Sequence, residues 1–514
     1  MDTPIKIIDL FAGPGGLGEG FSSLRDNKGD PFFKIALSIE KEKSAYKTLT
    51  LRAFYRQFPP TSVPPEYYDF LHGKLGNDPF EQLFNIPELK KYAKYATDEA
   101  KCLTLGKDND EIHTLISKAL GQDSQPWVLI GGPPCQAYSM VGRSRNKGNS
   151  LYSAESDHRS FLYLEYLKVI SKFQPTVFVM ENVKGMLSAK INGEKIIDDI
   201  LKDLKKPTSR IESNDSDIEY EIFSLSKEVS GEPEPSDFLI KSEDYGIPQA
   251  RHRVILLGVR KDYLIELKPE ILKKSPDKIV SVRDVICDLP RVRSGLSREE
   301  DTNETWIRAI NQSIKPVLEE LENTKQFLIA EEIKKSLQKM TGKPLSRGQN
   351  WAQKSISNKE PKKLLAWYQD PSYKKLVCNH DTRTHIRDDL IRYLFCSAYG
   401  RCESVTPNAT KFPESLAPKH KNWSSGNFSD RFRVQIADKP SKTIMSHIAK
   451  DGHYYIHYDP SQSRSLTVRE AARLQTFPDN YFFVGNRTEQ YVQVGNAVPP
   501  YLAIQIAKIV SKLF

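Results

Sequence analysis

The sequence predicts an α/β protein with an open β-sheet, followed by a second region of different character. Three observations predict this class. The chain begins with a short apolar strand at residues 6–11 that runs into a glycine-rich turn and a helix, an order typical of α/β folds in which bare backbone approaches a ligand. Later apolar strands are likewise followed by a glycine turn or a carboxylate. The alternation of strands and helices fades after about residue 260.

Composition sets the limits of this prediction. With 514 residues and 39% hydrophobic side chains, the chain can bury a sizeable core and form either three domains or one large domain with a second lobe. Apolar runs such as residues 127–130 are far shorter than the roughly 20 residues that cross a bilayer. The N-terminus has an acidic residue and no long apolar region, so no secretory signal is expected. We expect a soluble intracellular protein.

Charge and cysteine usage further limit which classes of protein fit this sequence. Lys and Arg number 75 against 66 acidic residues, a formal charge of +9, which permits nucleic-acid binding where basic residues cluster on one face. The six cysteines are scattered without a C-x-x-C pair. Neither a disulfide framework nor a metal site is therefore predicted.

The first candidate site is the glycine turn at residues 12–20. A second predicted strand, residues 33–40, ends in Glu40, whose carboxylate can accept hydrogen bonds from both hydroxyls of a ribose. No phosphate-binding G-x-x-x-x-G-K-[ST] loop is present. A tight turn without a ligand is the alternative that the glycines alone leave open.

The second candidate site gathers polar residues at later strand ends. The strand at 127–130 ends in Gly131-Gly-Pro-Pro-Cys135, which places Cys135 on a stiff loop where open α/β sheets bind ligands. Most free cysteines are small buried hydrophobes, but this proline-fixed loop argues against that role. Glu181 directly follows the strand at 176–180. Gln249, Arg251 and Arg253 occupy alternate positions before the strand at 254–259. This spacing predicts that their three polar side chains lie on one face of an extended segment.

The second half of the chain contains helices and a basic, aromatic region. Apolar residues at helical intervals predict an amphipathic helical insertion near 303–340. Residues 341–435 are rich in basic and aromatic side chains, which suit DNA contacts but equally suit a solvated lobe. Residues 465–475 predict a helix capped by Thr467, and a final helix is predicted at 501–510 with Pro499-Pro500 at its first turn.

Taken together, these blocks resemble the bacterial DNA (cytosine-5)-methyltransferases of restriction–modification systems. Each block is weak alone, but all six occur in the family's order along almost the whole chain. They are Asp9-Leu-Phe-Ala-Gly-Pro-Gly-Gly16, Gly132-Pro-Pro-Cys-Gln136, Glu181-Asn-Val183, Gln249-x-Arg251-x-Arg253, Arg469-Glu470 with Arg473-Leu-Gln475, and Gly495-Asn496.

The resemblance implies a Rossmann-like methyltransferase domain with a mixed, mostly parallel sheet and a smaller target-recognition domain. It places the catalytic domain at 1–274, the recognition domain at 275–484 and a returning segment at 485–514. It implies S-adenosylmethionine as cofactor and Cys135 as the nucleophile, with Glu181 as its partner. The implied supporting catalytic residues are Gln249, Arg251 and Arg253, and the implied cofactor residues are Phe11, Ala12, Gly13, Gly15, Gly16, Glu40 and Asn496.

The resemblance further implies double-stranded DNA as substrate, functional pairing with a restriction endonuclease, a monomer, and a bacterial cytoplasmic, nucleoid-associated location without a membrane. Two alternatives stay open: a tRNA cytosine-5 methyltransferase and a non-catalytic DNA-binding relative. The stretch between Glu40 and Cys135 is longer than in a minimal family member, so the acidic residue that meets the adenine is unassigned, with Asp108 and Asp110 as candidates. The recognised DNA sequence, the base that removes the proton from carbon 5, and a role for the insertion at 303–340 are unassigned too.

Overall fold

The chain divides into two units, each with its own core. The structure is a computed structural model that describes residues 3–122, 125–134, 162–191, 193–211, 218–264, 268–275, 279–355, 363–418 and 431–514. The first unit comprises Met1–Phe58, Asn85–Lys278 and Ala497–Phe514, and the second comprises Pro59–Phe84 and Ile279–Asn496. The sequence places the recognition domain at 275–484, so the structural division adds an early segment and a later end.

The first unit is built around an eight-stranded mixed sheet in the order β3-β2-β1-β4-β5-β11-β8, with β9 also paired to β11. Strands β3, β2, β1, β4 and β5 are parallel, whereas β11 runs antiparallel to β5, β8 and β9. The strands are β1 Ile5–Leu10, β2 Phe33–Glu40, β3 Ala100–Cys102, β4 Trp127–Gly131, β5 Val177–Val183, β8 Tyr220–Phe223, β9 Leu239–Lys241 and β11 His252–Arg260. A mostly parallel sheet needs both faces covered, which explains its near-continuous apolar strands.

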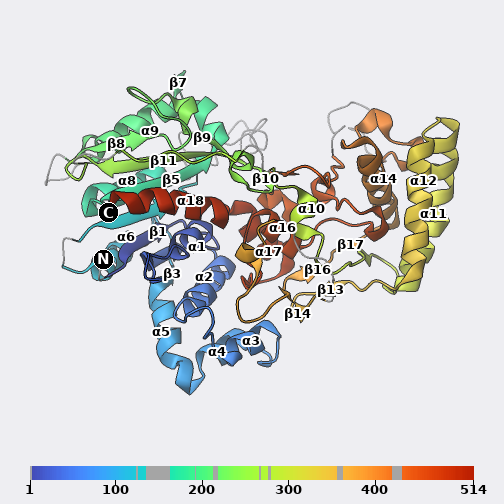
Figure 1. Ribbon diagram of the computed structural model, residues 1–514, viewed down its shortest axis with the longest axis horizontal. Coiled ribbons are helices and arrows are strands. Elements are labelled where there is room, and N and C mark those ends of the chain that lie inside the picture. The colour runs from blue at the N-terminus through green and yellow to red at the C-terminus, as the bar shows by residue number, and fades with distance from the viewer. Residues whose placement is uncertain are drawn as a thin grey trace. The chain divides into compact units, whose positions relative to one another are not determined.

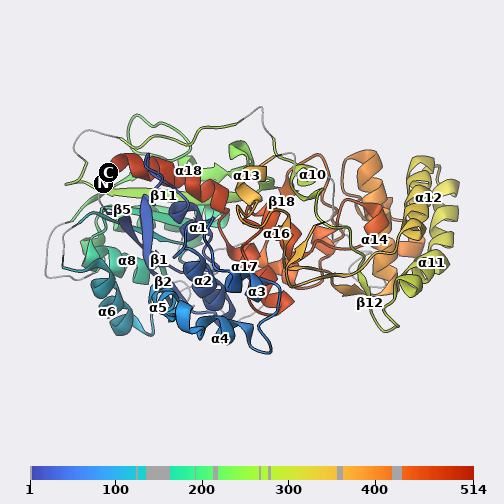
Figure 2. The same ribbon diagram turned by 60° about the horizontal axis from the view of Figure 1, so that its bottom comes forward.

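Helices cover both faces of this sheet (Figures 1 and 2). Helices α1 and α18 pack on one face around Phe21 and Leu502, and α6, α8 and α9 pack on the other around Ile112, Leu167 and Ile200. Strand residues alternate between these two cores, as the two-residue period of a strand requires. The helices of this unit are α1 Gly16–Ser22, α2 Lys43–Tyr55, α5 Lys90–Glu99, α6 Asn109–Leu120, α8 Leu162–Phe173, α9 Ile196–Lys205 and α18 Pro500–Val510. The predicted strands at 6–11, 33–40, 127–130, 176–180 and 254–259 and the predicted final helix are confirmed within a few residues.

The second unit combines helices with short two-residue strands. Its helices are α3 Pro65–Leu71, α4 Pro79–Phe84, α10 Val282–Ile286, α11 Asn303–Asn323, α12 Phe327–Gly342, α13 Leu365–Tyr368, α14 Arg387–Glu403, α16 Val468–Leu474 and α17 Arg487–Asn496. The short strand pairs are β12 Gly295–Leu296 with β17 Thr384–His385, β13 Gly348–Gln349 with β16 His380–Asp381, and β14 Gln353–Lys354 with β15 Leu376–Val377. Helix α16 has the predicted cap, since the Thr467 side chain accepts from the Glu470 amide and the Glu470 side chain accepts in return.

The predicted helical insertion forms two helices rather than one. Helices α11 and α12 pack against α14 (Figure 1). Trp306, Ile310 and Ile333 are fully buried in the core that these helices share. The amphipathic pattern of the insertion therefore reflects a core contact within the second unit.

An early segment of the chain, Pro59–Phe84, belongs to the second unit. The Leu71 carbonyl accepts a hydrogen bond from the Ala352 amide at 2.7 Å. Phe70 meets the rings of Trp351 and Phe482 edge-on, and those two rings stack on each other at 5.5 Å. The stretch after Glu40 that is long for the family is thus partly an element of the second unit. In the described part of the chain, no helix is both long and apolar enough to span a membrane, and no cluster of residues is suited to hold a metal ion.

Candidate active site

The glycine turn after β1 adopts a backbone that few residue types tolerate. Phe11, Gly13 and Gly15 have φ values of 56°, 58° and 93°, which lie in the left-handed region that favours glycine. The Gly15 amide donates to the Ala12 carbonyl at 2.9 Å, which closes the turn. A Cβ added at Gly13 would meet no atom of the described residues within 4 Å. The turn therefore presents open backbone at residue 13.

Gly16, which the resemblance implies as a cofactor residue, has a packing reason to be glycine. A Cβ at this position would lie 2.2 Å from the carbonyl oxygen of Val498. The start of α1 thus lies directly against the backbone that precedes α18. This contact explains the residue type without a ligand.

Glu40 holds the glycine turn from the neighbouring strand. One carboxylate oxygen of Glu40 accepts from the Gly13 amide at 2.8 Å, and the other accepts from the Glu42 amide at 2.8 Å. The side chain is buried, and burial raises the pKa of its carboxyl above the ordinary value. The parallel pairing of β1 and β2 brings the turn and the carboxylate together at one edge of the sheet.

Asp9 is a buried acid in this region that is not among the site residues predicted from the sequence. It is 1% exposed, and neither carboxylate oxygen has a hydrogen-bond partner among the residues that the structure describes. Burial raises the pKa of this carboxyl well above its ordinary value, an effect that Arg56 opposes and Glu40 reinforces. The signal in the sequence was an acidic residue inside an apolar strand. Burying a carboxylate without a partner costs free energy, and such groups are more typical of functional sites than of ordinary strands.

The edge formed by β4 and β5 carries the second candidate site. Cys135 itself lies outside the described residues, but the preceding loop is described as far as Pro134. The Asn182 side-chain amide donates to the Pro133 carbonyl at 3.1 Å. A Cβ at Gly132 would lie 3.1 Å from a carboxylate oxygen of Glu181. The Glu-Asn pair that ends β5 therefore contacts the loop that leads to Cys135.

Glu181 forms an ion pair with Arg253 across the antiparallel strands β5 and β11. Arg253 Nε lies 2.8 Å from Glu181 Oε1, with 13% and 12% of the two side chains exposed. The distance is that of an ion pair, but the atoms fall outside hydrogen-bond geometry. Burial lowers the pKa of Arg253 below its ordinary value, an effect that the Glu181 charge opposes. The pair is thus a partly exposed cation and anion beside the Gly132–Pro134 loop.

The prediction that Gln249, Arg251 and Arg253 share one face of an extended segment is wrong. The Arg251 amide donates back to the Gln249 carbonyl at 2.8 Å, so the chain turns between the short strand β10 Gln249–Ala250 and β11. Alternation requires continuous extended backbone, and this turn interrupts it. Gln249 and Arg251 are almost completely buried, whereas Arg253 reaches the partly exposed pair with Glu181.

Comparison with known proteins identifies the family. Residues 88–512 match the C-5 cytosine-specific DNA methylases, which is more than half of the chain. The chain belongs to this family. The methylase is 32% identical to the Type II methyltransferase M.Bpa9945I of Bacillus paralicheniformis over 98% of each chain. It is 25% identical to the Type II methyltransferase M.AgeI of Thalassovita gelatinovora over 99% of each chain.

A solved structure shows the same fold. The methylase superposes with a TM-score of 0.53 and 18% identity on a structure described as an Escherichia coli prophage-encoded DNA modification methyltransferase, with 99% of each chain covered. Methylation of cytosine carbon 5 in DNA is the activity of its family, and this activity requires a methyl donor.

The last two sequence blocks of the methylase lie at the end of the second unit. Asn496 is the last residue of α17 and is exposed. Its role at the cofactor stays a prediction. Arg469 is fully buried and donates to the carbonyls of Cys378, Pro478 and Tyr481.

The other charges of the Arg-Glu block are also internal. Glu470 pairs with Arg464 through two contacts of 2.7 Å, and Arg473 pairs with Asp479 through two contacts of 2.8 Å. The block therefore organises the interior of the second unit. Of the two candidate acids for the adenine, Asp108 has a structural contact: its side chain accepts from the Thr104 amide at 2.8 Å, just before α6.

Proposed function

We propose that this methylase transfers a methyl group from S-adenosylmethionine to carbon 5 of a cytosine that has been flipped out of duplex DNA. The observation that carries the proposal is the Glu181–Arg253 pair beside the loop that leads to Cys135. Carbon 6 of cytosine is inaccessible in a stacked duplex, so flipping is required for a protein side chain to reach it.

Cys135 is the proposed nucleophile. Carbon 5 of cytosine is a weak nucleophile, and addition of the Cys135 thiolate to carbon 6 converts the ring into an enamine whose carbon 5 can attack a methyl group. Glu181 holds N3 and stabilises the charge that develops there. Arg253 binds the carbonyl oxygen of the base. Loss of the proton from carbon 5 to a base that we do not assign allows the sulfur–carbon 6 bond to break, which restores Cys135.

The residues of the first unit are suited to the proposed cofactor. S-adenosylmethionine supplies an electrophilic methyl group on a positively charged sulfur. The open backbone at Gly13 and the Glu40 carboxylate offer close approach and hydroxyl acceptors at one sheet edge. Phe11, Ala12, Gly15, Gly16 and Asn496 complete the proposed set.

We further propose that the enzyme is the modification half of a restriction–modification system. The support is that the relatives above are named Type II methyltransferases. We propose a monomer that modifies nucleoid DNA in the bacterial cytoplasm and protects it from a partner endonuclease. The family match favours DNA over transfer RNA and an active enzyme over a non-catalytic binder.

Trapping on a modified duplex tests the mechanism. Duplexes with 5-fluorocytosine at the target position should form a stable covalent complex, because fluorine replaces the proton that must leave. The complex should be absent with Cys135→Ala, which should still bind DNA. Base-resolution sequencing of 5-methylcytosine in plasmids from expressing cells supplies the target site, and tRNA serves as the competing substrate. If Cys135→Ala retains turnover within a few-fold of wild type, the assignment of Cys135 as the nucleophile is contradicted.

A further inference from the structure

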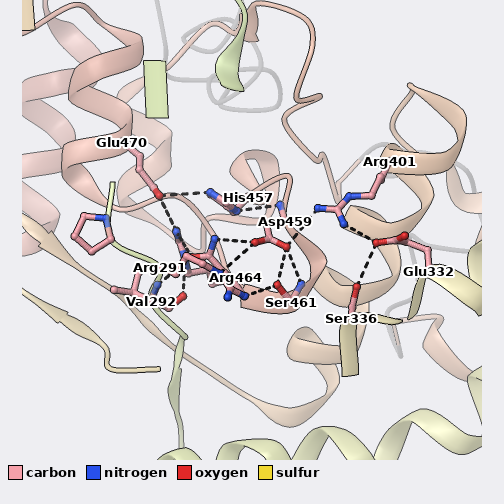
Figure 3. A network of polar contacts seen from close by, with 12 residues as sticks. Arg291, Val292, Glu332, Ser336, Arg401, His457, Asp459, Ser461, Arg464 and Glu470 are labelled. Atoms are coloured by element: carbon pink, nitrogen blue, oxygen red, sulfur yellow. Dashed lines mark hydrogen bonds and ion pairs between the residues drawn. The ribbon is translucent and has the colours of Figure 1, made fainter. Parts of the chain in front are cut away.

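The second unit contains a pocket of about 320 Å³ that the proposed function does not use. Residues from α10, the end of α12, the end of α14 and the turn at 457–464 line it. Figure 3 shows the polar network around it. The cationic side chains of the lining are Arg283, Arg291, Lys339, Arg401 and Arg464, and its carboxylates are Asp459 and Glu470.

Both carboxylates of the pocket already have cationic partners. Asp459 accepts from the Ser461 hydroxyl at 2.7 Å and lies 3.6 Å from Arg291 and 3.4 Å from Arg401 (Figure 3). Burial acts to raise the pKa of Asp459, but His457 and then the Ser461 hydroxyl and the two guanidinium groups lower this pKa to about 2. Glu470 is paired with Arg464. Both acids are therefore charged and compensated at neutral pH.

The Arg464 guanidinium has no donors left for a ligand. It donates to Glu470 and also to Val292, Gln462 and Ser465. Its contribution to the pocket is to neutralise Glu470. His457, beside the same carboxylate, is neutral at pH 7, because burial and Arg464 lower its pKa to about 3.

Two of the remaining cations, Lys339 and Arg291, have donors that the described residues do not use. Lys339 is exposed and has no ion-pair partner among the residues that the structure describes. Arg291 uses Nη2 for the Ser461 hydroxyl and Nε for Asp459, which leaves Nη1 for other contacts. Arg283 is paired with Asp438, to which its Nη2 donates at 3.4 Å, and Arg401 is paired with Glu332 at 2.6 Å. The positive charge and donors that stay available at the rim therefore come from Lys339 and Arg291.

We propose that this pocket binds a phosphate group. Guanidinium donors match phosphate oxygens in pairs, and a nearby ammonium adds a point charge. The phosphate has two sources that share this chemistry: the backbone of bound DNA outside the flipped base, or a free phosphorylated molecule. Only the first source rests on the proposed function.

The first measurement uses inorganic phosphate and pyrophosphate with the full-length enzyme. Calorimetric titration at constant ionic strength, with chloride as the matched salt, should detect binding to wild type. Lys339→Gln and Arg291→Gln should each weaken it at least tenfold. Lys315→Gln is the control, because Lys315 is 83% exposed on α11 and pairs only loosely with Glu319 at 3.9 Å.

The second measurement is the salt dependence of duplex binding with the same variants. Each lost phosphate contact should lower the slope of log K against log salt by about 0.9. A reduced slope assigns the pocket to the DNA backbone, and weakened phosphate binding with an unchanged slope assigns it to a free phosphorylated molecule. If neither variant changes phosphate binding or the slope, the proposal is overturned. Covalent trapping on 5-fluorocytosine duplexes is measured separately. A failure of the proposed catalytic mechanism can therefore be distinguished from a failure of the phosphate-binding proposal.

Discussion

Arg253 Nε lies 2.8 Å from Glu181 Oε1, and the two residues occupy diagonal positions on antiparallel strands. Ile255 is directly opposite Glu181, and Val183 is directly opposite Arg253. Opposed residues of a sheet point to the same face. The proposed catalytic pair is therefore brought together by strand register.

Glu181→Gln should lower turnover by roughly 100-fold or more, because the amide can bind N3 but cannot stabilise its protonated form. It should also lower the free energy of unfolding by about 3 kcal/mol, since Arg253 loses its counter-charge. Incorporation of labelled methyl groups and a denaturation curve measure the two effects. Glu243→Gln is the control, because Glu243 pairs with His252, the residue that precedes Arg253 in the sequence. Turnover within threefold of wild type would contradict the role of Glu181.

Glu40→Gln should weaken binding of S-adenosylhomocysteine by about 10- to 100-fold. The reason is the loss of charge-assisted hydrogen bonds worth about 1.5–3 kcal/mol, including that from the Gly13 amide. Calorimetric titration measures the affinity. Glu42→Gln is matched in charge and contributes no side chain to the turn, so it should bind normally. Equal affinities in both variants would count against the cofactor site.

Gly20→Ala should destabilise the first unit by about 1–3 kcal/mol through overpacking. A Cβ at Gly20 would lie 2.4 Å from that of Ala503 and 2.6 Å from the Ile504 nitrogen. Thermal unfolding should show a lower Tm. Gly342→Ala, whose Cβ would meet nothing within 4 Å, should change stability by less than about 0.5 kcal/mol. A neutral Gly20→Ala would mean that α1 and α18 can separate at little cost.

Glu470→Gln should lower the free energy of unfolding by about 3–5 kcal/mol, because it leaves the Arg464 charge buried and uncompensated. Guanidinium denaturation measures the change. Glu319→Gln removes one partner of an exposed pair and should have an effect below about 1 kcal/mol. Similar effects in the two variants would exclude a structural role for the buried pair.

Stability should fall as the pH decreases from about 6.5, the ordinary pKa of histidine. Burial lowers the pKa of both His385 and His457 to about 3. The unfolded chain therefore binds more protons than the folded chain between these values, and stability is lost by up to about 1.4 kcal/mol per pH unit for each histidine. His457→Gln should flatten the dependence of Tm between pH 6.5 and 5. The charged groups facing His457 are Glu470, Arg464 and Asp459. An unchanged slope would exclude His457 as a contributor.

Much of the fold follows from local sequence. The strands at 127–130 and 254–259 are short runs of apolar residues, the first bounded by Pro126 and Gly131 and the second by Arg253 and Arg260, and such bounded runs favour buried strands. Thr467 and Glu470 specify a helix start because their side chains complete each other's backbone hydrogen bonds within four residues. Glu40 and Glu181 are predictable for a similar reason: Glu40 ends a predicted strand, and Glu181 directly follows one. The family itself follows from the order of six short blocks.

Other features were decided only by tertiary structure. Gln249 and Arg251 have the alternation of a strand, but a hydrogen bond between them turns the chain. Residues 59–84 precede Cys135 in sequence, yet Phe70 and Leu71 pack on Trp351 and Ala352 of the second unit. Burial and pairing depend on residues hundreds of positions away, which no local pattern contains. The sequence alone thus determined the strands, the caps and the family, whereas long-range packing decided which charges pair, which stay buried, and to which unit each segment belongs.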